Sequence, residues 1–242
     1  MLQSNNWRSP QRLIRGAIAR GNLLYSLFFS PMPDIQFQTE PTLSLTTAPV
    51  ADLRAYLLTL ICQVAYREGD FLLTSGQHTD YYINGKQVTL HPQGAIAVGR
   101  VLLASIPDQA IAVAGLTLGA DPMVTAVSVV AGYEGRSLAA LIVRKEAKGH
   151  GTQAYIEGLP LPAGSPVVVL EDVVTTGQSA LKAVDRLRSH GYHVDRVLAL
   201  VDRNQGGREL YEQHQLHFEA IFTVDDLRQE WAKLHGASPS NP

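Results

Sequence analysis

The chain has 242 residues, of which 45% are hydrophobic and 17% are charged, a composition typical of a soluble globular protein with one large domain. Its formal net charge of −2 provides no overall basic field that would attract nucleic acid. The single cysteine, Cys62, excludes a disulfide framework. Because Cys62 lies among apolar residues at helical spacing, we expect a buried structural thiol in a reducing, cytoplasmic compartment.

The first 33 residues differ from the rest of the chain because they contain four arginines and no acidic residue. This pattern resembles a transit peptide, and the apolar run LLYSLFFSPM resembles a weak signal segment that is too short to span a bilayer. No small-residue cleavage site is evident, so the sequence favours a poorly ordered extension or a true start at Met32. We expect residues 1–48 to lie outside a folded domain of residues 49–242.

Apolar spacing predicts the elements of that domain. A helix is expected over residues 50–67, followed over 71–90 by short strands broken at Ser-Gly and Asn-Gly turns, which form a small antiparallel element. Further helices are predicted at 94–106, about 119–131, about 177–189 and 227–234, and strands at 111–115, 137–143, 167–170, 196–201 and 220–224. Strands that alternate with helices predict an α/β fold with a mainly parallel sheet covered on both faces, and such folds bind ligands at the carboxyl ends of their strands.

The stretch VVVLEDVVTTGQSA, residues 167–180, ends an apolar strand in two acids, Glu171 and Asp172, and then opens a helix. Free amides at a helix N-terminus, with Gly177 allowing close approach, favour an anion such as phosphate. Hydroxyl donors follow at Thr175, Thr176 and Ser179. The acids suit neighbouring hydroxyls or a hydrated magnesium ion, so a ribose 5-phosphate matches both halves. The alternative is an ordinary turn with capping acids.

Other nucleotide-binding loops have no support in the sequence, which contains neither G-x-x-x-x-G-K-[ST] nor G-x-G-x-x-G after a strand. The acidic stretch instead resembles the phosphoribosyl pyrophosphate (PRPP) loop of type I phosphoribosyltransferases, where two acids precede a threonine-rich phosphate turn. The resemblance implies that family's fold, with a small N-terminal hood element, and Mg²⁺ carried by PRPP near a catalytic Asp172. The implied substrate-binding residues are Glu171, Asp172, Val173, Val174, Thr175, Thr176, Gly177, Gln178 and Ser179.

A second motif, VRKEAKGHGTQAYIEG at residues 143–158, gathers four potential donors for a polyphosphate on a glycine-bearing loop. They are Arg144, Lys145, Lys148 and His150. Taken alone, this cluster could equally be a solvated surface loop. The pattern R-K-x-x-K-x-H-G is similar to the mobile catalytic loop of orotate phosphoribosyltransferases. The resemblance implies a homodimer whose loop covers the pyrophosphate in the neighbouring subunit's site, with Lys148 and His150 catalytic.

Two further segments resemble the same family. Tyr81 and Tyr82 match an aromatic pair that lies beside orotate, although a cross-strand aromatic couple is the alternative. Arg203 matches the residue that meets the orotate carboxylate, which a guanidinium fork suits; the alternative is a surface arginine. The sequence departs from part of the family at Thr74, where relatives have lysine, and in the lysine-free loop 115–123, which could still bind pyrophosphate through backbone amides.

The resemblance spans roughly residues 50–235 and implies transfer of the phosphoribosyl group from PRPP to orotate, giving orotidine 5′-phosphate and pyrophosphate in UMP biosynthesis. Two alternatives remain: a transferase for a purine or other base, and a PRPP-sensing regulator that binds nucleic acid. The basic loop and the lack of a recognisable groove-reading element argue against the regulator, so neither nucleic acid nor a membrane is expected as a partner. We expect His214 and His217, three apart on a predicted helix, to be surface residues rather than metal ligands.

Overall fold

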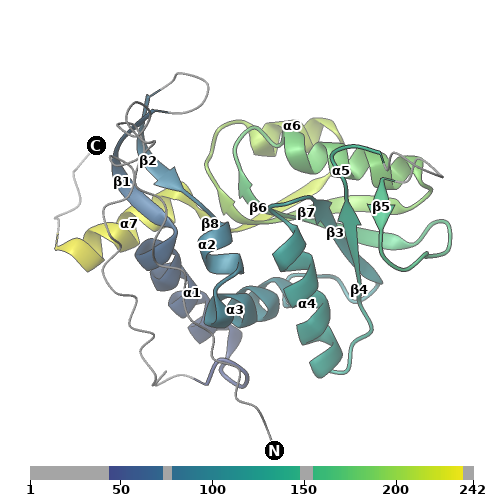
Figure 1. Ribbon diagram of the computed structural model, residues 1–242, viewed down its shortest axis with the longest axis horizontal. Coiled ribbons are helices and arrows are strands. Elements are labelled where there is room, and N and C mark those ends of the chain that lie inside the picture. The colour runs from purple at the N-terminus through teal and green to yellow at the C-terminus, as the bar shows by residue number, and fades with distance from the viewer. Residues whose placement is uncertain (1–43, 73–77, 148–154, 237–242) are drawn as a thin grey trace, which may run out of the picture. The chain divides into compact units, whose positions relative to one another are not determined.

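The computed structural model describes residues 44–72, 78–147 and 155–236, which form a six-stranded sheet with helices on both faces and a separate two-stranded hairpin (Figure 1). The hairpin pairs β1 (Tyr66–Leu72) with β2 (His78–Ile83) in antiparallel fashion. The sheet has the order β5-β4-β3-β6-β7-β8. Its strands are β3 (Ala112–Leu116), β4 (Ala139–Val143), β5 (Ile156–Glu157), β6 (Pro166–Val174), β7 (His193–Asp202) and β8 (His217–Thr223). Within this sheet, as far as the described residues show, only the β4–β5 pair is antiparallel, so the prediction of a mainly parallel α/β fold is confirmed.

Two helical layers cover the sheet, one on each face. One layer contains α1 (Val50–Val64), α3 (Pro92–Leu103), α4 (Asp121–Tyr133) and α7 (Val224–His235), and the other contains α5 (Gln178–Ser189) and α6 (Gly207–Gln213). The central strand shows why both layers form, because Val168 and Leu170 pack into the first core and Val167 and Val169 into the second. Alternate residues of a strand point to opposite faces, so a strand covered on both sides reads as an unbroken apolar run.

The connections of this sheet reverse direction at the carboxyl ends of β3 and β6, the position where open α/β sheets form a ligand-binding crevice. From β3 the chain continues to β4 on one side, whereas from β6 it continues to β7 on the other. Neighbouring loops therefore leave the sheet in opposite directions at this point, and open α/β sheets bind their ligands there. The loop after β6 is the acidic stretch 171–179.

Several predicted boundaries were wrong. The strand that we expected to end at residue 170 continues to Val174, because β7 pairs alongside it as far as Asp202. After Asn84 the chain forms a short helix, α2 (Lys86–Thr89), instead of a strand, with Val88 and Thr89 buried. The two-residue strand β5 was not predicted.

The histidine pair also differs from the prediction, because His214 and His217 do not share a helix. His214 is the C-cap of α6, and His217 is the first residue of β8. Both side chains belong to exposed residues, as expected. In the part of the chain that the structure describes, no group of three or more His, Cys, Asp or Glu side chains could hold a metal ion.

Cys62 is buried on α1, and the expectation of a structural thiol is confirmed. Burial, followed by the negative charges of Glu230 and Glu68, raises the pKa of its thiol to about 12, which keeps it protonated. Among the described helices, none combines the length and the apolar character that crossing a bilayer requires.

The start of the described chain packs onto the domain. Residues 1–43, with the alternative start at Met32, lie outside the described residues. Leu45 and Ala48 are buried, and Nη1 of Arg100 donates to both of their carbonyl oxygens, at 3.2 and 2.7 Å. These contacts fix the segment that leads into α1.

Candidate active site

The turn between β6 and α5 presents backbone amides at the end of the central strand. Gly177 has φ +81°, in the left-handed region, and α5 begins at the next residue without a side-chain cap. A Cβ at this position would lie only 3.0 Å from Cζ of Tyr211. The sequence therefore needs glycine here, and the uncapped N–H groups of the first helical turn are available to an anion.

A pocket of about 70 Å³ lies over this turn. It is lined by Glu171, Val173, Val174, Thr175, Thr176, Gly177, Gln178, Ser179, Ala180 and Tyr211. The structure thus brings the predicted residues 173–179 together with one of the two acids around a single small cavity.

The second acid faces another direction. Asp172 lies against two glycines, because a Cβ on Gly119 would be 2.6 Å from its Oδ1 and a Cβ on Gly85 would be 3.0 Å from its Oδ2. Oδ1 also accepts a hydrogen bond from the amide of Val173, at 3.0 Å. Glu171 therefore borders the phosphate-sized pocket on the α5 side, and Asp172 borders the crevice beside the loop that follows β3.

Both carboxyl groups are 8% exposed, and this burial raises both pKa values. For Glu171, burial and then the negative charge of Asp172 raise the pKa to about 8, while the charge of Lys145 opposes the shift. For Asp172, burial raises the pKa, and the Val173 hydrogen bond and the charge of Lys86 act against it. Each acid thus has one lysine near enough to favour its charged form.

Two residues that line the pocket each carry a buried oxygen atom with no hydrogen-bond partner among the described residues, namely Oε2 of Glu171 and the hydroxyl of Tyr211. Buried polar atoms are normally paired, so these two atoms mark an unusual polar environment next to the turn. Tyr211 was not predicted as a site residue. It comes from α6, and in the sequence it reads only as an apolar position of a helix.

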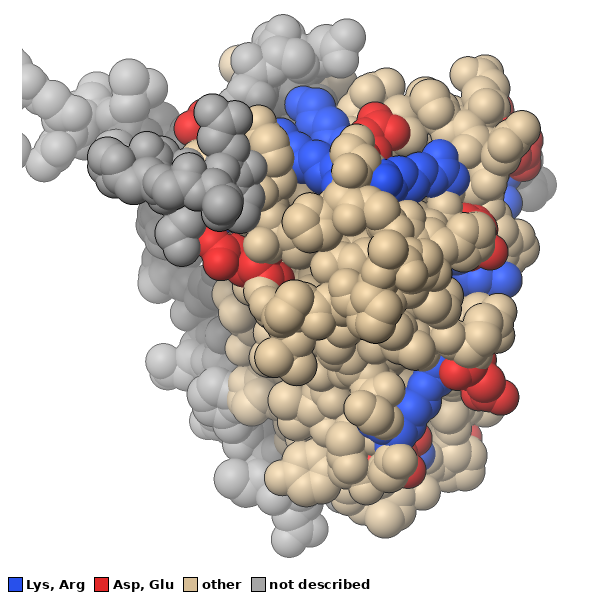
Figure 2. Space-filling model, turned by 90° about the vertical axis from the view of Figure 1, so that its right-hand side faces the viewer, with Lys and Arg blue, Asp and Glu red and all other residues tan. Residues whose placement is uncertain are grey.

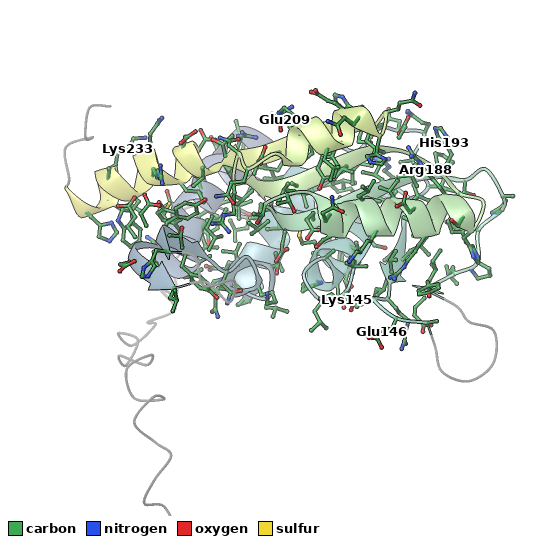
Figure 3. All side chains as sticks on the ribbon, turned by 90° about the horizontal axis from the view of Figure 1, so that it is seen from above. Lys145, Glu146, Arg188, His193, Glu209 and Lys233 are labelled. Carbon is green, nitrogen blue, oxygen red and sulfur yellow. The ribbon has the colours of Figure 1, made fainter. Side chains whose placement is uncertain are left out.

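The second predicted loop borders a larger pocket of about 390 Å³. It is lined by Thr117, Ile142, Arg144, Lys145, Glu146 and Glu157. The structure therefore places Arg144 and Lys145 beside Thr117 of the lysine-free loop. Lys145 and Glu146 lie next to each other and well apart from Arg188 (Figure 3). Lys148 and His150 lie outside the described residues.

The predicted aromatic pair is split. Tyr81 is buried, and its hydroxyl accepts a hydrogen bond of 2.9 Å from Nε of Arg203, whose guanidinium carbon is 4.8 Å from the centre of the Tyr81 ring. Tyr82 is 46% exposed and contacts Phe71 instead. Neighbouring residues of a strand point to opposite sides, so only Tyr81 joins Arg203.

Arg203 also connects to the turn of residues 171–179, which we call the phosphate turn, because its amide donates to the carbonyl oxygen of Val174, at 2.9 Å. Asp172 is surrounded by Lys86, Gly85 and Gly119, which were not predicted as site residues. The only sequence signal for the first two was the Asn-Gly-Lys that follows the tyrosine pair. Thr74 lies outside the described residues.

Comparisons with known proteins agree with this geometry. The phosphoribosyl transferase domain family matches residues 84–225. An orotate phosphoribosyltransferase from Nostoc sp. is 68% identical over 188 residues, which cover 78% of this chain and 91% of the relative.

Solved structures give the same result. Orotate phosphoribosyltransferase from Mycobacterium tuberculosis H37Rv, in complex with Fe(III) dicitrate, matches with a TM-score of 0.64 at 38% identity, covering 72% of this chain and 98% of that one. The same enzyme in complex with PRPP matches with a TM-score of 0.61 at 34% identity, covering 73% and 99%. The chain therefore belongs to the orotate phosphoribosyltransferase family.

Proposed function

We propose that this chain transfers the 5-phosphoribosyl group of PRPP to orotate, which gives orotidine 5′-phosphate and pyrophosphate for UMP biosynthesis. The observation that carries this proposal is the strand-turn-helix of residues 171–179, which places two buried carboxyl groups beside an uncapped helix N-terminus. The bond from ribose C1 to pyrophosphate breaks, a bond from C1 to a pyrimidine nitrogen forms, and the proton of that nitrogen passes to the released pyrophosphate or to solvent. No covalent nucleophile on the protein is required.

We assign the phosphate turn to the ribose 5-phosphate end of PRPP. The amides of Thr176–Ser179 and the hydroxyls of Thr175, Thr176 and Ser179 would hold the 5-phosphate in the small pocket. Glu171 and Asp172 would accept hydrogen bonds from the ribose diol and favour positive charge that develops on the sugar ring. A solved relative in complex with PRPP supports PRPP as the ligand.

The residues at the crevice fit a magnesium ion that arrives with PRPP. Magnesium keeps several waters and is held by one or two carboxylates together with substrate phosphates, rather than by an all-protein cage. Asp172 supplies such a carboxylate, and no larger cluster of ligands occurs among the described side chains. When bound, the ion would supply charge neutralisation of the leaving pyrophosphate.

We assign the 144–150 segment to the pyrophosphate. Arg144 and Lys145 border the larger pocket beside Thr117, and the charge of Lys145 also acts on Glu171 of the smaller pocket, which supports a role for this cation at the pyrophosphate. Lys148 and His150 are assigned to the same group by the R-K-x-x-K-x-H-G pattern. These cations would stabilise the negative charge that develops on the leaving group.

The pairing of Arg203 with Tyr81 favours orotate over a purine. Arg203 follows β7 at the carboxyl edge of the sheet and is tied to the phosphate turn through Val174. A guanidinium held by an aromatic ring suits a flat base that bears a carboxylate, which orotate has and the common purine bases lack. Tyr82 stays a predicted orotate contact, although in this structure it faces away from Arg203.

A PRPP-sensing regulator that binds nucleic acid is the second candidate class, and the face drawn in Figure 2 does not favour it. Figure 2 shows one face of the molecule, where basic side chains occur in small separate groups with acidic ones nearby. A nucleic-acid interface needs basic residues gathered on one face or in one groove. The net charge of −2 agrees with the enzyme assignment.

We further propose that residues 49–242 form the phosphoribosyltransferase domain of a cytoplasmic homodimer in which the basic loop serves the neighbouring subunit's site. Mixing two inactive variants tests the shared site. Lys148→Ala and Asp172→Asn homodimers should each be inactive, and equal mixing after reversible dissociation should restore about a quarter of the wild-type activity. Failure to restore activity, with hybrid dimers demonstrated, would mean that each subunit uses its own loop.

The reaction itself is tested by a spectrophotometric assay. Protein, orotate, PRPP and magnesium are mixed, and the loss of orotate absorbance is followed with wild type and Lys148→Ala in parallel. We expect turnover that requires magnesium and falls sharply in the variant. An absence of turnover with orotate, together with PRPP binding in a calorimeter, would remove orotate as the substrate and lead to a screen of purine bases.

A further inference from the structure

Arg186, on α5, contacts both ends of the segment that carries the basic loop. Its Nη1 donates to the carbonyl oxygen of Arg144, and its Nη2 donates to the carbonyl oxygen of Lys145, at 2.7 Å. Its guanidinium carbon also lies 4.3 Å from the centre of the Tyr155 ring. The two ends are joined to each other as well, because the amide of Arg144 donates to the carbonyl oxygen of Tyr155, at 2.8 Å.

The guanidinium of Arg186 binds backbone carbonyl groups here and not an anionic group. The guanidinium is always charged and offers several donors in a fixed plane, so it can hold two successive carbonyl groups in one geometry. With those carbonyls directed at α5, the chain around Arg144 and Lys145 is fixed where their side chains border the larger pocket. Hydrogen bonds to a charged donor are stronger than those between neutral groups.

The position of Arg186 on α5 makes the connection specific. The first turn of α5 carries the phosphate turn, and Arg186 lies in the last turn of the same helix. One rigid helix therefore holds the 5-phosphate pocket at its N-terminus and the base of the basic segment near its C-terminus. The distance between the two anion sites is then set by the helix and not by the flexibility of a loop.

We propose that Arg186 is a positioning residue for the pyrophosphate end of the site: it sets where Arg144 and Lys145 stand relative to the phosphate turn. The inference rests on the proposed function, since it assumes that these two cations meet pyrophosphate. It predicts that loss of Arg186 weakens the pyrophosphate end and leaves the ribose 5-phosphate end intact. A purely structural role of Arg186 would weaken both ends together.

The test measures the binding of two ligands separately by calorimetry: magnesium pyrophosphate and ribose 5-phosphate. The variants are Arg186→Gln and Arg186→Lys, and the matched control is Arg188→Gln. Arg188 is on the same helix and also donates to a backbone carbonyl, that of Val194, but it lies apart from Lys145 (Figure 3). We expect Arg186→Gln to weaken pyrophosphate binding about tenfold or more, with ribose 5-phosphate unchanged. The affinity of Arg186→Lys for pyrophosphate should lie between those of wild type and Arg186→Gln, because lysine keeps the charge but lacks the planar guanidinium that reaches both carbonyl groups.

Kinetics give a second readout that folding alone would not move. The KM for PRPP should rise in Arg186→Gln while the KM for orotate stays constant. Should Arg186→Gln fail to fold, Tyr155→Leu serves as the second variant and Tyr155→Phe as its control, since phenylalanine keeps the ring beneath the guanidinium. Tyr155→Leu should weaken pyrophosphate binding and Tyr155→Phe should not.

If Arg186→Gln binds both ligands equally more weakly, or binds pyrophosphate as well as Arg188→Gln does, the role of Arg186 is wrong while the proposed function still stands. If wild-type protein binds neither ligand and does not turn over orotate, the proposed function fails and the inference fails with it. Wild-type turnover combined with unaltered pyrophosphate binding in Arg186→Gln separates the two cases.

Discussion

The two regions that we propose to bind the phosphate and pyrophosphate of PRPP are built in different ways. The turn of residues 171–179 is fixed by backbone: a paired strand leads into it, a left-handed glycine bends it, and a helix begins at its end. The segment around Arg144 and Lys145 is fixed by side chains, mainly by the guanidinium of Arg186. The first kind of site depends on residues adjacent in sequence, whereas the second depends on a residue about forty positions away.

The largest effect should come from disturbing the backbone-built turn. Gly177→Ala places a Cβ 3.0 Å from the Tyr211 ring at φ +81° and should shift the amides that face the pocket. We expect kcat/KM for PRPP to fall on the order of 100-fold, because small misplacements of binding groups have large kinetic effects. Steady-state kinetics at varied PRPP concentration measures this.

Gly164→Ala is the matched control for that change. Gly164 has φ +79°, and a Cβ there would meet nothing within 4 Å. Both variants should lose about 1–2 kcal/mol of unfolding free energy from the left-handed conformation. Comparable kinetic losses in the two variants would show that the turn has no special role in binding.

A smaller effect should come from the side-chain-built segment. Lys145→Ala removes a cation that borders the larger pocket and acts on Glu171, so kcat/KM for PRPP should fall ~10- to 100-fold. Lys182→Ala, an exposed lysine of α5, is the control and should leave the value unchanged. Parallel losses in both variants would point to net charge rather than to the position of Lys145.

Because the pKa values of Glu171 and Asp172 are raised, these two acids should affect how protein stability depends on pH. The pKa of Glu171 is raised from 4.5 to about 8, so the folded protein binds a proton that the unfolded chain releases over this interval. The free energy of unfolding should therefore fall as the pH rises from 4.5 to about 8, by on the order of 1 kcal/mol per pH unit. Glu171→Gln should reduce this slope and leave the part that the raised pKa of Asp172 contributes.

Denaturant unfolding at a series of pH values measures the slope. Glu209→Gln, at an exposed position of α6, should keep the wild-type slope. If Glu171→Gln also keeps it, the Glu171 carboxyl is ionised throughout the range, and its burial does not hold the proton.

The smallest effect is expected at the ion pair between Arg144 and Glu157, where Nη1 and Oε1 are 3.2 Å apart and the side chains are 39% and 42% exposed. Exposed pairs contribute little, so Glu157→Gln should change the unfolding free energy by less than about 1 kcal/mol. Thermal unfolding of wild type and Glu157→Gln measures this change in unfolding free energy. A larger loss would mean that the segment depends on this ion pair rather than on Arg186.

The same contrast explains how far the sequence could predict the structure. The phosphate turn was predictable because its strand, glycine and helix start are local features with known backbone geometry. The continuation of β6 to Val174 was not, because it depends on pairing with β7. The helix α2 was missed for a similar reason, since burial of Val88 and Thr89 in the tertiary structure decided it.

Contacts between distant segments account for the site residues that were missed. Tyr211 comes from a helix after β7, and it reaches the pocket only because α6 packs against the phosphate turn. Lys86 acts on Asp172 from across the crevice. Periodicity and motifs report what is adjacent along the chain, so they do not reveal such neighbours. The split of Tyr81 from Tyr82, in contrast, follows from strand alternation and was available in the sequence.

The buried carboxyl of Glu171 should also make the binding of PRPP release a proton. With its pKa raised by burial to about 8, this group is mostly protonated at neutral pH before PRPP binds. A ligand that donates hydroxyl groups to it, and that brings a magnesium ion close, favours the carboxylate and sends the proton to the buffer. The observed binding enthalpy would then vary with the ionisation enthalpy of the buffer chosen, and the affinity for PRPP would rise with pH up to about 8.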